Sequence, residues 1–146
     1  MIEIKNKKAY YDYFIEEELE CGIVLKGTEV KSIRKGLANI KDSYAMIRNN
    51  EVMLINMYIA KYNDGGVFNH EERRTRKLLL NKKEILKLRD KIEISGFTLV
   101  PLKCIFKGNK VKIILGVAKG KKLYDKRQSL KEKDLKKDIE KSLKNK

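Results

Sequence analysis

The sequence predicts a mainly β protein: an antiparallel barrel of the oligonucleotide/oligosaccharide-binding type, with about three flanking helices and a C-terminal arm. Three observations lead to this prediction. Short apolar segments alternate with glycine- and asparagine-rich turns, a capped helix interrupts them, and the last residues are dominated by lysine and glutamate. A mixed α+β sandwich is the alternative architecture. With 146 residues, the chain is long enough to bury one hydrophobic core.

Apolar segments separated by turn signals predict the strands. They are expected at residues 13–25, on the N-terminal side of Asn49-Asn50, and at residues 52–60, 77–80, 97–106 and 110–118. Asn49 and Asn50 tolerate the positive φ angles of a tight hairpin turn, and a second hairpin turn is expected at residues 107–109. Gly22 indicates a bend or bulge in the first strand. Pro101 should lie at an edge or bulge, because it has no N–H to donate.

Two helices are predicted within the body. The first covers residues 28–35, with Thr28 as its N-cap. The second covers residues 82–95, where Asn81 and Glu84 form a capping pair and the apolar residues repeat on one face.

Two segments are expected to lack regular structure. Residues 1–9 are polar and basic, and residues 61–76 are predicted to form a long polar loop. His70 lies in this loop, where contact with RNA or with solvent is favoured over a catalytic role.

The basic excess indicates an anionic partner. The chain has 35 Lys and Arg against 20 Asp and Glu, a net charge of +15, which is typical of proteins that bind nucleic acid or anionic membranes. The charge is divided between a body at residues 1–119 and a basic tail at residues 120–146. The tail is expected to be disordered when free and helical when docked, because its few leucines cannot hold a helix alone. Gly116 and Gly120 are expected to form a swivel between the two parts.

Other features argue against a secreted, membrane-bound or catalytic protein. No apolar segment has the length of a membrane span, and Cys21 and Cys104 are expected to be reduced, buried thiols of a cytoplasmic protein. Glu16, Glu18 and Glu20 could hold Mg²⁺ in a nuclease, but a solvated strand face is the preferred interpretation. Because no nucleophile motif or phosphate-binding glycine loop is present, we expect no enzyme activity, no metal and no cofactor.

Basic side chains are the expected RNA contacts, because guanidinium and ammonium groups bind phosphate. The residues that share this expectation are Arg73, Arg74, Arg76, Lys77, Lys119, Lys121 and Lys122. Tyr10, Tyr11 and Tyr13 add faces on which bases can stack. Structured RNA is favoured over duplex DNA, since no helix-turn-helix or zinc-finger pattern occurs. A general RNA chaperone or ribosomal protein is the alternative.

Six short motifs occur in the order typical of one family. They are YFIEE at residues 13–17, GTEVKS at 27–32, ANIKDSY at 38–44, RTRKLLLNKKE at 74–84, TLVPL at 98–102 and GVAKGKKLYDKR at 116–127. Through these motifs, the chain resembles the small protein B (SmpB) family of bacterial ribosome rescue over residues 8–132.

The resemblance implies a non-enzymatic cytoplasmic protein, for which we expect a monomer. It would bind the tRNA-like domain of transfer-messenger RNA and deliver it to stalled ribosomes for trans-translation. Elongation factor Tu would be a partner only through the RNA. On the ribosome, the protein would reach the decoding centre, and its tail would occupy the empty mRNA channel.

The resemblance also assigns residues. It implies RNA contacts at Asn6, Glu20, Leu79 and Lys112, and ribosome contacts at Tyr11, Asp125, Lys126 and Arg127. Two positions depart from the family pattern. Tyr11 stands where the family often has a histidine, so it keeps stacking ability but loses a protonatable ring. Leu37 stands where a basic residue is more common.

Overall fold

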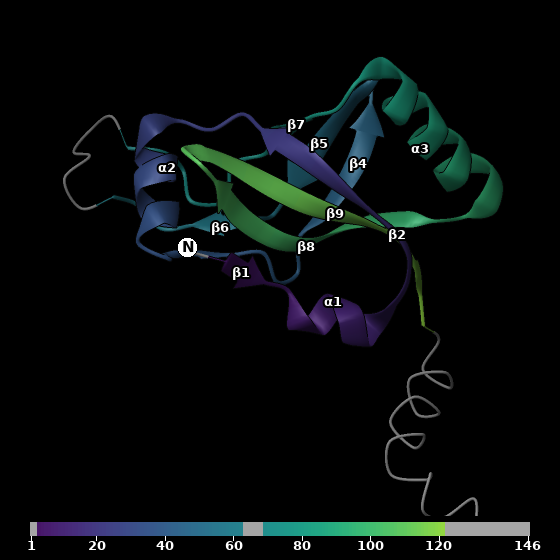
Figure 1. Cartoon of the computed structure of the whole chain (residues 1–146), viewed down its shortest axis with the longest axis horizontal. Coiled ribbons are helices and arrows are strands. Elements are labelled where there is room, and N and C mark those ends of the chain that lie inside the picture. Colours follow the sequence, from purple (N-terminus) through teal and green to yellow (C-terminus); the bar gives the residue numbers. More distant parts are fainter. Residues whose placement is uncertain (1–2, 63–68, 122–146) are drawn as a thin grey trace, which may run out of the picture.

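The core of the fold is an antiparallel sheet that curls into a closed ring. The computed structural model describes residues 3–62 and 69–121. Its strands are β1 (Glu3–Lys5), β2 (Tyr13–Ile23), β3 (Ala38–Asn39), β4 (Tyr44–Arg48), β5 (Glu51–Ile55), β6 (Tyr58–Ile59), β7 (Arg76–Leu79), β8 (Thr98–Lys107) and β9 (Lys110–Gly120). The main sheet has the order β1-β8-β4-β5-β7-β2-β9, and pairing between β8 and β9 closes the ring. The predicted mainly β barrel is confirmed (Figure 1).

The ring is uneven, because its strand pairs differ in length. β9 runs alongside β2 and β8 over most of its residues, whereas β4 and β8 pair at one position, Ala45 with Leu99. The interior is filled by apolar side chains from every side of the ring, among which Leu54, Leu99 and Ile113 are at most 1% exposed. Alternate residues of β5 and β7 enter this core, whereas β8 and β9 also bury Val100, Leu102 and Ala118 in a second cluster with Ala9 of the N-terminal helix.

Three helices flank the barrel: α1 (Lys7–Asp12), α2 (Gly27–Arg34) and α3 (Lys82–Ser95). Figure 1 shows α2 and α3 at opposite ends of the barrel, with α1 near the point where β2 begins. α3 has the predicted caps, since the Asn81 side chain accepts from Glu84 N at 2.9 Å and Gly96 adopts a left-handed φ of 71°. No helix in the described ranges is long and apolar enough to cross a membrane.

The N-terminal segment is more ordered than predicted. Residues 1–9 were expected to be loose, but β1 pairs with β8, and α1 begins at Lys7. Asn6 fixes this segment, because its side chain accepts from Ala9 N at 3.1 Å and donates to the carbonyl oxygen of Pro101 at 2.9 Å. The partner strand is about a hundred residues away in the sequence, so no local pattern could indicate the pairing.

The start of α2 also differs from the prediction. The helix begins at Gly27, and Thr28 is inside it rather than at its N-cap. Thr28 Oγ1 lies 2.9 Å from His70 Nδ1, and His70 Nε2 lies 2.9 Å from the carbonyl oxygen of Ile59. His70 is 1% exposed, so the expected surface or RNA-contacting histidine is instead a buried link between α2 and β6.

Two strand irregularities were predicted, at Gly22 and Pro101, and a third was not. The strand expected at residues 52–60 is split into β5 and β6 by Asn56, whose φ is 70°. The irregularity of β2 lies between Ile15 and Glu17 rather than at Gly22. Pro101 does lie next to a register shift in the β8–β9 pairing, as its missing N–H predicts.

Gly116 is a packing position rather than a swivel. It lies within β9, paired with Glu18 of β2 and Val100 of β8, and a Cβ there would approach Leu102 Cδ1 to 2.8 Å. The strand is also fixed at its end, because Lys121 N donates to the Asp12 carbonyl oxygen at 2.9 Å. The predictions for the tail, residues 122–146, lie outside the described residues.

Candidate RNA interface

Three of the expected RNA contacts come from three strands and meet around Gly22. Gly22 of β2 pairs with Leu79 of β7 on one side and with Lys112 of β9 on the other, while Glu20 is two residues earlier on β2. Directly paired residues and i, i+2 neighbours share one face of a sheet, so Glu20, Leu79 and Lys112 project from the same face. This is the outer face, because Leu79 is 51% exposed.

Gly22 makes the arrangement possible. A Cβ at this position would lie 3.1 Å from the Leu79 Cβ and 3.3 Å from its Cδ1, so the leucine occupies the space that any larger residue would need. Gly22, which was expected to bend the strand, therefore provides space on the sheet surface for the Leu79 side chain.

A groove of about 330 Å³ adjoins this cluster. It lies between the β2–β7 pair, the β8–β9 turn and α2; its lining includes Leu79, Val30, Lys110 and Lys112. Apolar walls beside two ammonium groups suit a nucleotide, whose base or ribose packs on aliphatic carbon while its phosphate binds lysine.

Glu20 adds an acceptor at the edge of the cluster. Lys107 Nζ lies 3.2 and 3.4 Å from its two carboxylate oxygens, and Lys107 is the more exposed partner. A surface ion pair of this kind is weak and exchanges readily, so both groups remain available to a ligand. The carboxylate can accept from a base edge, while the ammonium group binds the adjacent phosphate.

Two of the expected RNA contacts have buried side chains. Arg76 is 0% exposed and Asn6 is 4% exposed. The Arg76 guanidinium binds Glu29 through Nε and donates from Nη1 to the Met57 carbonyl oxygen at 2.6 Å. The Asn6 amide donates to the carbonyl oxygens of Ile40 and Pro101 and accepts from Ala9 N, so both side chains are held inside the fold by partners within the chain.

The buried carboxylate of Glu29 is the centre of an ion network. It binds Arg76 on one oxygen and Arg74 Nη2 at 2.5 Å on the other, which also accepts from Lys26 N at 2.8 Å. Burial would raise the pKa of Glu29, but these hydrogen bonds outweigh it and hold the pKa below its ordinary value. Glu29 is therefore ionised, and Arg74, expected to bind RNA, is largely used in neutralising it.

The remaining basic residues of the expected arginine cluster point in different directions. Arg73 is exposed, stacks over the Tyr58 ring at 5.4 Å and donates to the Asn56 carbonyl oxygen at 3.2 Å. Lys77 is exposed on β7 and faces Glu51 at 3.4 Å. Neighbours in the sequence were thus separated by strand alternation, which turns Arg76 inward and Lys77 outward.

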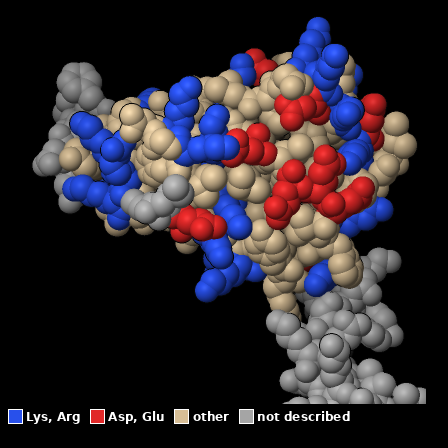
Figure 2. Space-filling model, viewed as in Figure 1, with Lys and Arg blue, Asp and Glu red and all other residues tan. Residues whose placement is uncertain are grey.

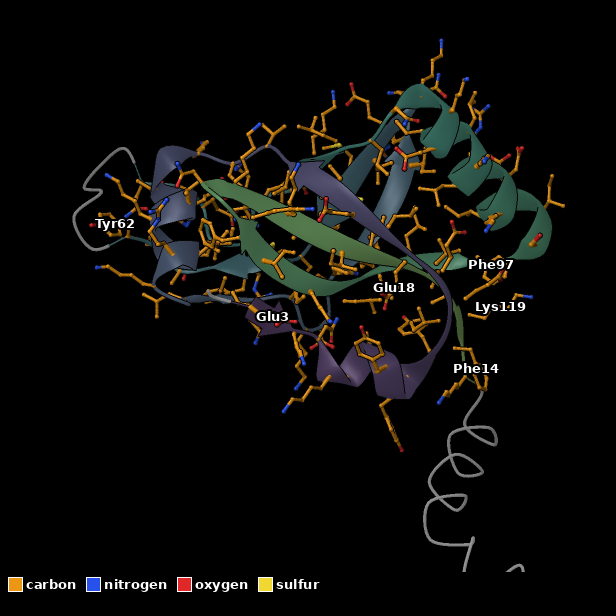
Figure 3. The ribbon with its side chains drawn as sticks, in the orientation of Figure 1. Glu3, Phe14, Glu18, Tyr62, Phe97 and Lys119 are labelled. Carbon is orange, nitrogen blue, oxygen red and sulfur yellow. The ribbon has the colours of Figure 1, made fainter. Side chains whose placement is uncertain are left out.

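Lys119 and Lys121 lie at the end of β9, each against an aromatic ring. Lys119 Nζ is 4.7 Å from the Phe97 ring centre (Figure 3). Lys121 Nζ is 4.8 Å from the ring centre of Phe14. Phe14 is 51% exposed and Tyr11, on α1, is 41% exposed. Exposed aromatic faces beside ammonium groups suit stacking and phosphate binding together. Expected contacts at Lys122, Asp125, Lys126 and Arg127 lie outside the described residues.

The charges are unevenly distributed on the visible face. Figure 2 shows acidic side chains gathered over the middle of the β2 side, whereas basic side chains lie over the end that carries α2 and also, among acidic ones, over the end that carries α3. Glu17 forms an ion pair with Lys91 of α3 at 2.5 Å, and Glu16 lies 3.9 Å from the same ammonium group. The described part of the chain holds no group of three His, Cys, Asp or Glu residues that could bind a metal ion.

Both cysteines are free and buried, as expected. Burial raises the pKa of Cys21 to about 12, with smaller contributions from Glu84 and Glu20, and burial alone raises the pKa of Cys104 to about 12. Both thiols are therefore protonated at neutral pH, and they pack as small apolar side chains.

Comparison with known proteins places this chain in a family. The family model described as SmpB protein matches residues 3–145. SsrA-binding proteins of Staphylococcus aureus strains Newman and COL are each 55% identical over 140 residues, covering 96% of this chain and 91% of theirs. A solved chain described under "tmRNA-SmpB: a journey to the center of the bacterial ribosome" is 44% identical with a TM-score of 0.71, covering 88% of this chain and 94% of that chain. The chain belongs to the SmpB protein family.

Proposed function

We propose that the protein binds the tRNA-like domain of transfer-messenger RNA and delivers it to stalled ribosomes for trans-translation. The observation that carries this proposal is the meeting of Glu20, Leu79 and Lys112 on one outer face beside a nucleotide-sized groove. The relatives named SsrA-binding proteins, and the solved structure whose description joins tmRNA, SmpB and the bacterial ribosome, support the same partners.

The proposal divides the work between two parts of the chain. The barrel body holds the RNA, with Lys119 and Lys121 beside it, while the basic tail enters the mRNA channel of the ribosome. Tyr11 and the Asp125-Lys126-Arg127 segment face the ribosome, elongation factor Tu is met only through the RNA, and the protein acts as a monomer in the cytoplasm. The net charge of +15 supports RNA partners at both ends.

The first test measures preference for one RNA. A labelled tRNA-like domain is bound to the full chain and competed with bulk tRNA at 0.15 M salt. We expect bulk tRNA to compete at least a hundredfold less well than the unlabelled domain. Equal competition would support the alternative, a general RNA chaperone, and would reject the proposal.

The second test addresses the face itself. Leu79→Ser should weaken binding about tenfold, since a half-exposed leucine packed on a base or ribose contributes about 1–2 kcal/mol when fully covered. Leu86→Ser is the matched control, because Leu86 is 40% exposed on α3, away from the cluster. Equal affinities for the two variants would show that Leu79 does not contact RNA.

The third test separates the two parts of the chain. A chain that ends after Lys121 keeps the whole of β9 and the hydrogen bond to Asp12. It should bind the tRNA-like domain with nearly the affinity of the full chain but fail to support tagging in a reconstituted translation reaction. Lost RNA binding in this variant contradicts the division into body and tail.

A further inference from the structure

The solvent-facing side of α2 is uniformly basic. Lys31 and Arg34 are exposed, as is Lys35 directly after the helix. The one carboxylate of the helix, Glu29, is 0% exposed and is neutralised from the barrel side by Arg74 and Arg76. Only positive charge is therefore presented to solvent along this short helix.

Two of these cations converge on a single aromatic ring. Lys31 Nζ lies 5.3 Å and Lys35 Nζ 4.9 Å from the ring centre of Tyr62, which lies beside α2 (Figure 3). Neither lysine forms an ion pair with a carboxylate in the part of the chain that the structure describes. Two ammonium groups held together without a counter-charge repel one another and create a local positive potential, which an anion between them would relieve.

This basic surface continues from the groove at Leu79 and Lys112. Val30 of α2 forms one wall of that groove. One helical turn further on, Arg34 stacks over Phe106 of β8 at 5.4 Å, with its guanidinium group exposed. The eight residues of α2 span about 12 Å, so a strand of RNA leaving the groove meets three cations in succession.

We propose that the RNA bound at Leu79 and Lys112 continues across α2, where Arg34, Lys31 and Lys35 bind its backbone phosphates and Tyr62 holds the two lysines in place. The inference rests on the proposed function and extends its binding site to the end of the barrel. Recognition here is of phosphate, because the α2 surface offers donors and no carboxylate that could accept from a base.

The helix is held rigidly enough to present these cations. Glu29 ties α2 to Arg76 of β7, and Thr28 ties it to His70, which in turn reaches the Ile59 carbonyl oxygen of β6. Because the helix is fixed before binding, little ordering entropy is lost when a phosphate is bound.

The test compares two pairs of lysines with equal charge and spacing. Lys31→Gln/Lys35→Gln removes the proposed contacts, and Lys83→Gln/Lys87→Gln removes two exposed lysines at the same i, i+4 spacing on α3. Affinity of each full-length variant for the tRNA-like-domain RNA is measured from 0.05 to 0.5 M salt.

Each lost phosphate contact should lower the slope of log affinity against log salt by about 0.7–0.9, so the α2 pair should lower it by about 1.4–1.8. From a 1 M reference, this corresponds to about a 15- to 30-fold loss at 0.15 M salt. The α3 pair should change the slope by less than about 0.5, because it acts only through net charge. Equal changes for the two pairs would overturn the inference.

A second measurement locates the RNA. Lys35→Cys and Lys83→Cys variants carry an iron chelate that cleaves nearby RNA backbone, and the two native cysteines are protected by burial. Cleavage of the tRNA-like domain from position 35 and not from position 83 is expected; the absence of cleavage from position 35 contradicts the inference. The unmodified protein distinguishes this failure from failure of the proposed function. If it shows no preference for this RNA over bulk tRNA, the proposed function itself fails.

Discussion

Replacing Glu29 with glutamine should destabilise the protein strongly, because two arginines depend on its charge. Glu29 and Arg76 are both 0% exposed, and the second carboxylate oxygen binds Arg74. The amide of Glu29→Gln presents an NH₂ group where one carboxylate oxygen accepts, so a donor faces a donor and a buried guanidinium loses its counter-charge. Breaking a buried pair by removing one partner costs about 3–5 kcal/mol.

The expected size of the effect is a large part of the total stability. Domains of this size unfold with about 5–15 kcal/mol. With about 2.1 cal/mol/K of unfolding entropy per residue over roughly 110 ordered residues, a loss of 3–5 kcal/mol lowers Tm by about 13–22 °C. Urea unfolding followed by circular dichroism measures the loss at 25 °C without the ionic screening that guanidinium would introduce.

The matched control is Glu51→Gln. Glu51 forms an exposed pair with Lys77 at 3.4 Å, and surface pairs contribute about 0–1 kcal/mol. The control should therefore remain within about 1 kcal/mol of the unmodified protein. If Glu29→Gln also stays within this range with an unchanged urea dependence, the reasoning about the buried network is refuted.

The same network predicts a dependence on pH. The folded-state pKa of Glu29 lies below its unfolded value, so ionised Glu29 contributes stability above the unfolded pKa, near 4.3. That contribution is lost as pH falls through the lower folded-state pKa. The stability difference between the unmodified protein and Glu29→Gln should accordingly be constant from pH 6 to 7 and shrink below about pH 4.3; a difference that grows on acidification contradicts the assignment.

Three further predictions concern other buried positions. Gly116→Ala should lower the free energy of unfolding, measured with urea, by about 1–3 kcal/mol, because its Cβ would lie 2.8 Å from Leu102 Cδ1. Asn6→Ala should cost about 2–3 kcal/mol in the same assay, because it removes the cap of α1 and leaves buried carbonyl groups unpaired. Cys21 and Cys104, with pKa values of about 12, should resist a thiol reagent at pH 8 in the folded protein and react once it is unfolded.

Each of these has a control or a contrary outcome. Gly27→Ala is the control for Gly116→Ala, because nothing lies within 4 Å of the added Cβ, and its stability should be unchanged or slightly higher. An unchanged stability of Asn6→Ala would show that the amide hydrogen bonds contribute nothing net. Fast labelling of either thiol under native conditions would mean that its strand opens readily.

Local rules explain the features that the sequence predicted correctly. The caps of α3 depend on residues three apart, and the β4–β5 turn depends on two asparagines that accept φ angles of 52° and 60°. Apolar segments bounded by turn signals indicated the long strands β8 and β9, and their pairing follows from the short turn between them. Such signals lie within one turn or hairpin, so the sequence contains them directly.

The resemblance to a family named Glu20, Leu79 and Lys112, but their positions in the sequence do not show that they lie together. Only the register of β7, β2 and β9 around Gly22 shows that they share an outer face. Conversely, residues 73–77 were grouped as one basic cluster because they are adjacent in the sequence. The Arg76 side chain points into the core, so these residues do not form one surface cluster.

The sequence by itself determined the mainly β fold, the α3 helix and the basic character of the surface to which anionic partners bind. Tertiary structure decided which basic residues are available to RNA, because availability depends on partners distant in the chain. Glu29 pairs with Arg76 and Arg74 and keeps them largely buried, whereas Lys31 and Lys35 remain exposed and both contact the Tyr62 ring. Net charge is a sum over the composition, but a binding surface is set by which charges remain unpaired after folding.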